Sequence, residues 1–280
     1  MKKLDQLFHL LFGKGMSKWY LLFFGIYFSS ISLVNHYMFR TSTRDLGIYS
    51  NAIYDYSHFR VNDCTLLADP GASLENAAFD NKLSDHFSIT QFLFAPFRYL
   101  LGTYTLLIFQ ILAVLLGGWG IFKYFSQLVE NEMLGTVAMV HFFWLFGIHS
   151  ALAFDYHDNV IGAVLLPWLL YFLRKGKWLP FLTFWVVIIG CKETMSILLT
   201  SVLGVLTFFP LDKGNRQQRW MSGITTGLSL VYFLTITQWV MPSLANPGQA
   251  EYLHFKYSAL GSNYGEALAF AATHPMQTLG

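Results

Sequence analysis

Charged residues are scarce in this sequence, and their scarcity excludes most soluble classes of protein. Only 12% of the 280 residues are Asp, Glu, Lys or Arg, whereas soluble domains carry about 25%. So few charges cannot cover the surface of a soluble globule of this length. Two cysteines exclude a disulfide scaffold, and a net charge of +2 gives no reason to expect a nucleic-acid partner.

Apolar residues are correspondingly abundant and lie in long runs. Hydrophobic residues make up 54% and aromatic residues 18% of the chain, and the mean hydropathy is +0.44. Several runs are long enough for a helix to cross a bilayer core of about 30 Å. We therefore expect one all-α polytopic membrane domain over residues 1–280, a transmembrane helical bundle with spans at about 19–39, 104–125, 133–152, 159–173, 178–191, 194–209 and 221–241.

The stretch 178–209 is open to two interpretations. It is apolar except for Lys192 and Glu193. A single tilted span would place the basic stretch 212–219 outside, against the rule that basic loops stay in the cytoplasm. Two short helices that turn at Lys192 would return this stretch to the inside, and we favour this hairpin.

The distribution of charge predicts the orientation in the membrane. Basic residues dominate the N-terminal region, the turn at 174–177 and the stretch 212–219. The long polar stretch 40–103 instead begins with seven acidic against four basic residues, Lys82 among them. We expect a bacterial inner-membrane protein with a cytoplasmic N-terminus. The stretch 40–103 then forms an outer loop after the first span and carries short interfacial helices.

Five polar clusters fall at the predicted outer face or its membrane margin. They are Arg44-Asp45, Asp85-His86, the stretch 155–158, Lys192-Glu193 and the later loop from Glu251 to Lys256. Ionisable groups at membrane depth are costly and usually face a cavity or each other. Such a set could bind a divalent cation, deprotonate a hydroxyl, or hold a phosphate on its lysine.

Each cluster also has a purely structural interpretation. Asp45 could pair with Arg44, and Asp85 could cap the helix that follows it. Lys192 and Glu193 could neutralise each other at a turn. Taken one at a time, these structural roles are the more common ones. The convergence of all five clusters at one level raises the case for a functional site.

Five short motifs resemble a known family. Arg44-Asp45-Leu46-Gly47, Asp85-His86-Phe87-Ser88, Phe154 to Asp158, Cys191-Lys192-Glu193-Thr194 and the later Tyr257 to Ser262 occur in order along the chain. Together they are similar to a bacterial family of uncharacterised predicted membrane proteins. That family is grouped with the GT-C glycosyltransferases, polytopic enzymes that use polyprenyl-phosphate sugars. Its members continue beyond position 280, which implies that this chain is an N-terminal portion.

The resemblance implies roles for the polar residues. An acidic residue just after the first span is central to GT-C catalysis, and Asp45 occupies that place. Three residues take catalytic roles. Asp45 would be the general base on the acceptor hydroxyl or would orient it, Lys192 would neutralise the leaving phosphate, and Glu193 would position Lys192. The expected substrate-binding residues are Arg44, Asp85, His86, His157 and Asp158, and the last four could hold a divalent metal ion. Asp158 departs from the family motif, which often has Pro there.

The function that follows is transfer of a sugar from a polyprenyl-phosphate donor at the outer face of the inner membrane. The expected partners are the lipid bilayer and that donor. A transporter with an outer-face polar cavity is one alternative, although the charges lie at one face rather than at mid-membrane and no repeat is visible. A non-catalytic membrane scaffold is the other, although a scaffold does not need so many outer His and Asp residues.

Overall fold

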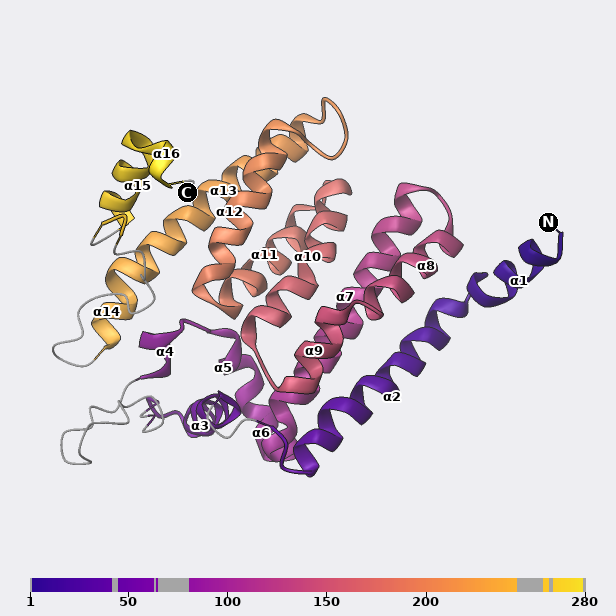
Figure 1. Cartoon of the computed structure of the whole chain (residues 1–280), viewed down its shortest axis with the longest axis horizontal. Coiled ribbons are helices and arrows are strands. Elements are labelled where there is room, and N and C mark those ends of the chain that lie inside the picture. Colours follow the sequence, from indigo (N-terminus) through magenta and orange to yellow (C-terminus); the bar gives the residue numbers. More distant parts are fainter. Residues whose placement is uncertain are drawn as a thin grey trace.

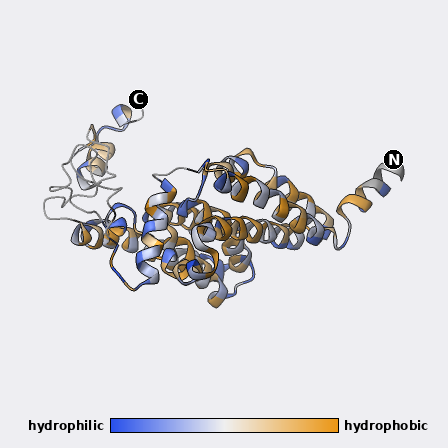
Figure 2. Ribbon diagram, turned by 90° about the horizontal axis from the view of Figure 1, so that it is seen from below, coloured by the Kyte–Doolittle hydropathy of each residue, from blue (hydrophilic) through white to orange (hydrophobic). Residues whose placement is uncertain are grey.

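The computed structural model describes residues 2–41, 45–62, 64, 81–245, 259–261 and 264–278. These residues form helices and no strand, which confirms the all-helical prediction. Figure 1 shows long helices side by side and a group of short ones at one end of the bundle. In Figure 2 hydrophobic residues colour much of the long helices, as expected of helices that face lipid or each other.

Among the described residues, three helical segments are long and apolar enough to cross a membrane. They are α2 (Met16–Tyr37) and the continuous stretches Thr90–Leu128 and Arg216–Leu244. A fourth candidate is the pair α8 (Glu132–Phe143) and α9 (Phe146–Phe154), which bends by 47°. This helical content agrees with a membrane protein.

The bend between α8 and α9 was not expected from the unbroken apolar run 133–152. Leu145 has an extended backbone, with φ −61° and ψ 131°, and this ends the helical hydrogen-bond ladder. Trp144 stacks on His149 across the bend, with ring centroids 5.5 Å apart. Ring packing thus stabilises the break, although no proline marks this position in the sequence.

Two helical hairpins form the second half of the bundle. Helix α10 (Asp158–Arg174) packs on α11 (Trp178–Cys191), and α12 (Glu193–Phe208) packs on α13 (Arg216–Thr235). Between α11 and α12, Lys192 has φ −163° and ψ 147°, so the chain leaves the helical conformation at this residue. The stretch 178–209 is therefore two short helices that meet at Lys192.

Short helices gather where α2 ends and α7 (Thr105–Leu128) begins, at the lower end of the bundle in Figure 1. They are α3 (Asp45–Ser57), α4 (Lys82–Asp85), α5 (Thr90–Phe94), η2 (Ala95–Phe97), α6 (Arg98–Leu101) and η3 (Gly102–Tyr104). Asp85 ends α4, and α5 has no side-chain cap at Ile89. The interpretation of Asp85 as a helix cap is therefore wrong.

The opposite end of the bundle carries the turns between α7 and α8, between α10 and α11, and between α12 and α13 (Figure 1). Helix α13 continues through the π-helix η4 (Ile236–Val240) into α14 (Met241–Leu244), which contacts α4. The remaining described helices are α1 (Lys2–Phe12), α15 (Tyr264–Thr273) and α16 (Pro275–Thr278).

The centre of the bundle is α7, which contacts α2, α8 and α10. Gly117 allows a close approach of α7 to α10, because a Cβ atom there would lie 2.3 Å from the backbone oxygen of Val164. Small residues at such crossings are usual where helices pack within lipid. The tight packing fixes the turn before α10 against α7, and this turn carries part of the candidate site.

Candidate functional site

The candidate site lies where four chain segments meet at one end of the bundle. The end of α4 contributes Asp85 and His86, and α5 contributes Gln91. The turn between α9 and α10 contributes the stretch 155–158, and the break between α11 and α12 contributes Lys192 and Glu193. Contacts between these segments join residues more than 60 positions apart in the sequence.

Three side chains form a continuous polar chain. The Nζ atom of Lys192 lies 3.1 Å from His86 Nε2, and His86 Nδ1 lies 3.1 Å from Glu193 Oε1. The second oxygen of Glu193 accepts the backbone N–H of Phe87 at 3.0 Å. Glu193 is fully buried, whereas Lys192 and His86 are half-buried. Glu193 therefore positions His86, and through it Lys192, rather than bonding Lys192 directly.

The order of these contacts determines which ring nitrogen of His86 carries the proton. A lysine ammonium can only donate, so Nε2 of His86 must accept, and Nδ1–H then donates to Glu193. Burial lowers the pKa of His86 below its ordinary 6.5, although Glu193 and Asp85 oppose this. The neutral imidazole that the chain of contacts needs is thus also the favoured form at neutral pH.

Acidification should destabilise the protein through His86. Because its folded-state pKa is lowered, the unfolded chain binds more protons between that value and 6.5. The contribution to stability is complete above 6.5 and is lost as the pH falls through the folded-state pKa. Thermal unfolding midpoints from about pH 8 to about pH 5 should decline in the wild type and decline less in His86→Gln. An equal decline in both proteins would contradict this role for His86.

Asp158 is the centre of a second, deeper network. Its carboxylate is fully buried and accepts the Gln91 amide through both oxygens, at 3.2 and 3.0 Å. The hydroxyl of Tyr156 donates to the same carboxylate. These contacts saturate the carboxylate from inside the protein, so Asp158 stabilises the α5–α10 junction and has little surface for a ligand.

Lys82 belongs to this site, although its position in the sequence does not predict it. Its side chain is 1% exposed, its Nζ donates to the backbone oxygen of His86 at 3.2 Å, and it lies 4.8 Å from the centre of the Tyr49 ring. Burial lowers its pKa, while the negative charges of Asp158, Asp85 and Glu193 raise it. Lys82 therefore supplies buried positive charge between the Asp158 network and the Lys192 chain.

Tyr49 connects Asp45 to the rest of the site. It projects from α3 and is buried beside Tyr156, with ring centroids 5.1 Å apart. Burial raises its pKa far above the ordinary value, and nearby carboxylates raise it further, in the order Asp158, Asp85, Asp45 and Asp155. Asp45, the half-buried first residue of α3, is thus within electrostatic reach of the same tyrosine as Asp85 and Asp158.

His157 and Asp155 form a pair at the edge of the site. The half-exposed His157 has Nδ1 3.4 Å from Oδ1 of Asp155, and its backbone N–H donates to Gln110 at 2.8 Å. Both carboxylate oxygens of Asp155 are buried and make no hydrogen bond to a described residue. The contact with His157 is therefore electrostatic rather than an aligned hydrogen bond.

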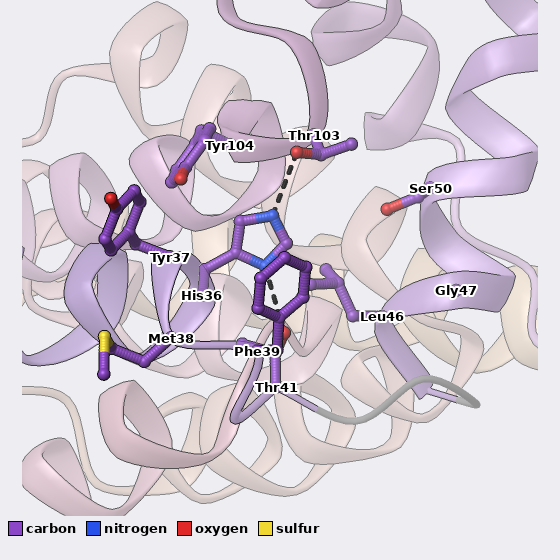
Figure 3. Close-up of a pocket in the computed structure, with 10 residues that line it drawn as sticks. All are labelled: His36, Tyr37, Met38, Phe39, Thr41, Leu46, Gly47, Ser50, Thr103 and Tyr104. Atoms are coloured by element: carbon purple, nitrogen blue, oxygen red, sulfur yellow. Dashed lines mark hydrogen bonds between the residues drawn. The ribbon is translucent and has the colours of Figure 1, made fainter.

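A cavity of about 830 Å³ adjoins the start of α3 (Figure 3). His36 occupies its centre, and its two ring nitrogens lie 3.0 and 2.9 Å from the hydroxyls of Thr41 and Thr103. The rest of the lining is mostly apolar: Tyr37, Met38, Phe39, Leu46, Gly47, Ser50 and Tyr104. The residues that follow Asp45 directly in the sequence thus form one wall of a cavity large enough for a lipid headgroup.

An apolar groove of about 480 Å³ extends along the same pair of helices. On α2 its lining residues Leu22, Ile26 and Ser29 lie on the helical face that also carries His36. On α7 it is lined by Ile108, Ile111, Leu112 and Leu115, one to three turns beyond the Tyr104 wall of the cavity. Cavity and groove therefore follow one seam between α2 and α7.

The structure places the predicted site residues unevenly. His86, Lys192 and Glu193 are in contact; Asp85, Asp158 and Asp45 share the electrostatic surroundings of Tyr49 or Lys82; His157 lies beside Asp155. Arg44 lies outside the described residues, as do the polar cluster 251–256 and the predicted motif at 257–262 except its described residues 259–261. Within the described part of the chain, no group of three or more His, Cys, Asp or Glu side chains could hold a metal ion.

The comparisons with known proteins give one match. The profile of a family described as "Predicted membrane protein (DUF2079)" matches residues 35–280, which includes every residue of the candidate site. No curated protein and no solved structure matches the chain.

Proposed function

The chain belongs to this family of predicted membrane proteins, and we propose that it transfers a sugar from a polyprenyl-phosphate donor to a hydroxyl acceptor. One observation supports this most strongly. A cavity of headgroup size lies against α3, the helix whose Tyr49 packs on Lys82 of the polar cluster, and an apolar groove follows the same seam between the membrane-length helices α2 and α7. A substrate with a charged head and a long hydrocarbon tail matches both parts.

The tail of the donor would occupy the seam between α2 and α7. Leu22, Ile26 and Leu112 are at least 52% exposed although they line the groove, so their apolar surface is open to lipid. The polar head would then lie at the cavity near His36 and the start of α3. This arrangement keeps the hydrocarbon out of water and presents the phosphate at the polar end of the bundle.

Asp45 and Lys192 would act on opposite sides of the transferred sugar. The Asp45 carboxylate takes the proton of the acceptor hydroxyl as that oxygen bonds to the anomeric carbon. The bond from this carbon to the phosphate oxygen breaks, and its electron pair leaves with the phosphate. Lys192 neutralises the growing negative charge. Attack from the face opposite the phosphate inverts the anomeric carbon.

The remaining residues would support these two. Glu193 is buried, so it positions His86 and Lys192 and does not touch the substrate. Asp85 and His157 are accessible enough to contact the acceptor, whereas Asp158 holds the floor of the site. Because Asp158 is saturated by Gln91 and Tyr156, the set Asp85, His86, His157 and Asp158 does not fit a metal, and no step passes through one.

The proposal places the site at the outer face of the inner membrane. The turns rich in Lys and Arg, at the opposite end of the bundle, would then be cytoplasmic. Val61 and Lys213 are exposed at the two ends, while Cys64 and Cys191 are buried. In intact cells an impermeant thiol reagent should label Val61→Cys and leave Lys213→Cys unlabelled until the membrane is opened. Labelling of Lys213→Cys in intact cells would overturn the orientation.

The direct test of the function is transfer by the purified full-length protein in liposomes. Polyprenyl-phosphate sugars with different sugar groups are supplied with membrane extract as acceptor, and release of polyprenyl phosphate is measured. Release that depends on both donor and acceptor supports the proposal. Full-length protein that binds these donors but releases no polyprenyl phosphate with any of them would reject it.

A further inference from the structure

A second cavity lies at the opposite end of the bundle, between α12 and α13. Its volume is about 760 Å³. Arg216, Arg219 and Trp220 line it from α13, and Thr207 and Phe208 line it from α12. None of these residues belongs to the candidate transfer site, so this cavity needs an explanation of its own.

The residues of α13 that line this cavity all lie on one face of the helix, so the cavity is a cleft between two packed helices. Positions 216, 219, 220, 223 and 224 lie on one face of α13, because residues three and four apart are neighbours on a helix. At Gly223 the two helices approach so closely that a Cβ atom would lie 3.3 Å from Cγ2 of Thr207. The helices are thus in contact at Gly223, and the cleft extends from there to the polar end.

The positive charge in this cleft is not neutralised within the described structure. Neither Arg216 nor Arg219 forms an ion pair with a described residue. Asp212, in the turn just before them, instead pairs with Arg174 at 3.0 Å and accepts the Gln218 amide at 2.7 Å. Arg219 donates only a long hydrogen bond, of 3.4 Å, to the backbone oxygen of Phe208. Two guanidinium groups therefore remain able to bind an anion.

The apolar side of the cleft indicates where this anion comes from. Phe208 is 72% exposed and Trp220 is 66% exposed, and Ile224 is about half exposed one turn further along. Tryptophan is enriched where a membrane meets water. A soluble anion would leave this apolar surface uncovered, whereas a phospholipid would cover it with its acyl chains.

We propose that this cleft binds one anionic phospholipid of the leaflet at this end of the bundle. The phosphate bonds to Arg216 and Arg219, since guanidinium groups bind phosphate oxygens in pairs. The acyl chains lie along Phe208, Trp220 and Ile224. Basic pockets between transmembrane helices are known to take anionic headgroups in this way. The site is separate from the transfer reaction and does not depend on it.

The test measures lipid affinity on the full chain in detergent micelles. Phosphatidylglycerol and phosphatidylcholine with identical acyl chains are titrated, and bound lipid is counted by native mass spectrometry. Inorganic phosphate is titrated in parallel against the unfolding temperature. Arg216→Gln with Arg219→Gln removes both charges. Ile224→Trp fills the cleft and keeps both charges, and Lys213→Gln removes a nearby charge outside the cleft.

We expect the wild type and Lys213→Gln to bind phosphatidylglycerol alike and much more tightly than phosphatidylcholine. The double Gln variant should bind it about 30-fold more weakly, since each interfacial arginine contributes to the attraction. Ile224→Trp should weaken binding comparably. This variant provides the test of the cleft if the double Gln variant does not fold. Equal binding of both lipids, an equal effect of Lys213→Gln, or stabilisation by phosphate alone would overturn the proposal.

Discussion

Replacement of Lys192 by Met is expected to reduce sugar transfer by about 10²–10³-fold with little loss of folded protein. The methionine keeps the aliphatic stem and removes only the ammonium group. Lys192 is half-buried, and its contact is with neutral His86 rather than with Glu193 itself. The carboxylate of Glu193 therefore keeps its bonds from His86 and from the Phe87 backbone when the ammonium is removed.

Asp45→Asn should reduce the same reaction by about 10²–10⁴-fold, because the amide keeps the shape of the carboxylate but cannot take a proton. Initial rates of polyprenyl-phosphate release at saturating donor would measure both losses. Asp55→Asn is the control on the same helix, since Asp55 lies near the other end of α3 and pairs with Arg60. Lys213→Met is the control for a lysine at the opposite end of the bundle.

The two variants separate catalysis from folding. Undiminished transfer by Asp45→Asn would rule out its role as base, and undiminished transfer by both variants would remove the catalytic assignment. A fall in the yield of folded Lys192→Met, with the remaining protein as active as wild type, would instead identify Lys192 as a structural partner of His86 and Glu193. Size-exclusion profiles and helical circular dichroism supply the folding readout.

The second large effect concerns stability rather than rate, and its source is Asp158. Asp158→Asn should lower the free energy of unfolding by about 3–5 kcal/mol, the usual cost of breaking a buried ionic network from one side. The amide keeps the shape, but the buried ammonium of Lys82 loses the largest of its compensating charges. Tyr156 and Gln91 also lose the carboxylate to which they donate.

A double-mutant cycle tests whether Lys82 and Asp158 act together. Adding Lys82→Met to Asp158→Asn removes the uncompensated charge, so the double variant should lose less than the sum of the single losses, by about 0.5–3 kcal/mol. Unfolding by denaturant in detergent micelles gives the three values. Asp212→Asn, at a pair with a half-exposed carboxylate, is the control and should cost about 0–1 kcal/mol. Additive losses would mean that Lys82 and Asp158 are energetically independent.

Apolar runs in the sequence are enough to predict an all-helical membrane protein, because a helix is the way a chain satisfies its backbone groups within lipid. The same runs do not predict where a helix bends. Nothing in Trp144-Leu145-Phe146 differs in polarity from its neighbours, and the break there depends on packing against residues from α2, such as Phe24. Local patterns carry no information about such distant contacts.

The candidate site shows the same limit. Asp85-His86 and Lys192-Glu193 are visible as polar interruptions of apolar sequence, and they are indeed in contact. Lys82 looks like one more countercharge in an acidic loop, and only the fold reveals that it is buried. Gln91, Gln110 and Tyr49 carry no charge, so a search for charged motifs passes over them. Tyr49 and Gln91 follow Asp45 and His86 by about one helical turn, a signal that could have identified them, whereas Gln110 lies far from every charged motif.

Helices α11 and α12 are shorter than the apolar thickness of a bilayer. Their 14 and 16 residues reach about 21 and 24 Å, against a hydrocarbon core of about 30 Å. Helices α4 and α5 cover the turn between them, which lies just above them in Figure 1. Ile89 packs closely on this turn, because a Cβ atom at Gly190 would lie 2.9 Å from Cγ1 of Ile89. Such hydrophobic mismatch thins the surrounding lipid or leaves the turn recessed below the headgroups. A lipid-linked substrate could then meet Lys192 without being lifted out of its leaflet, and lipids of shorter chain length should favour this encounter.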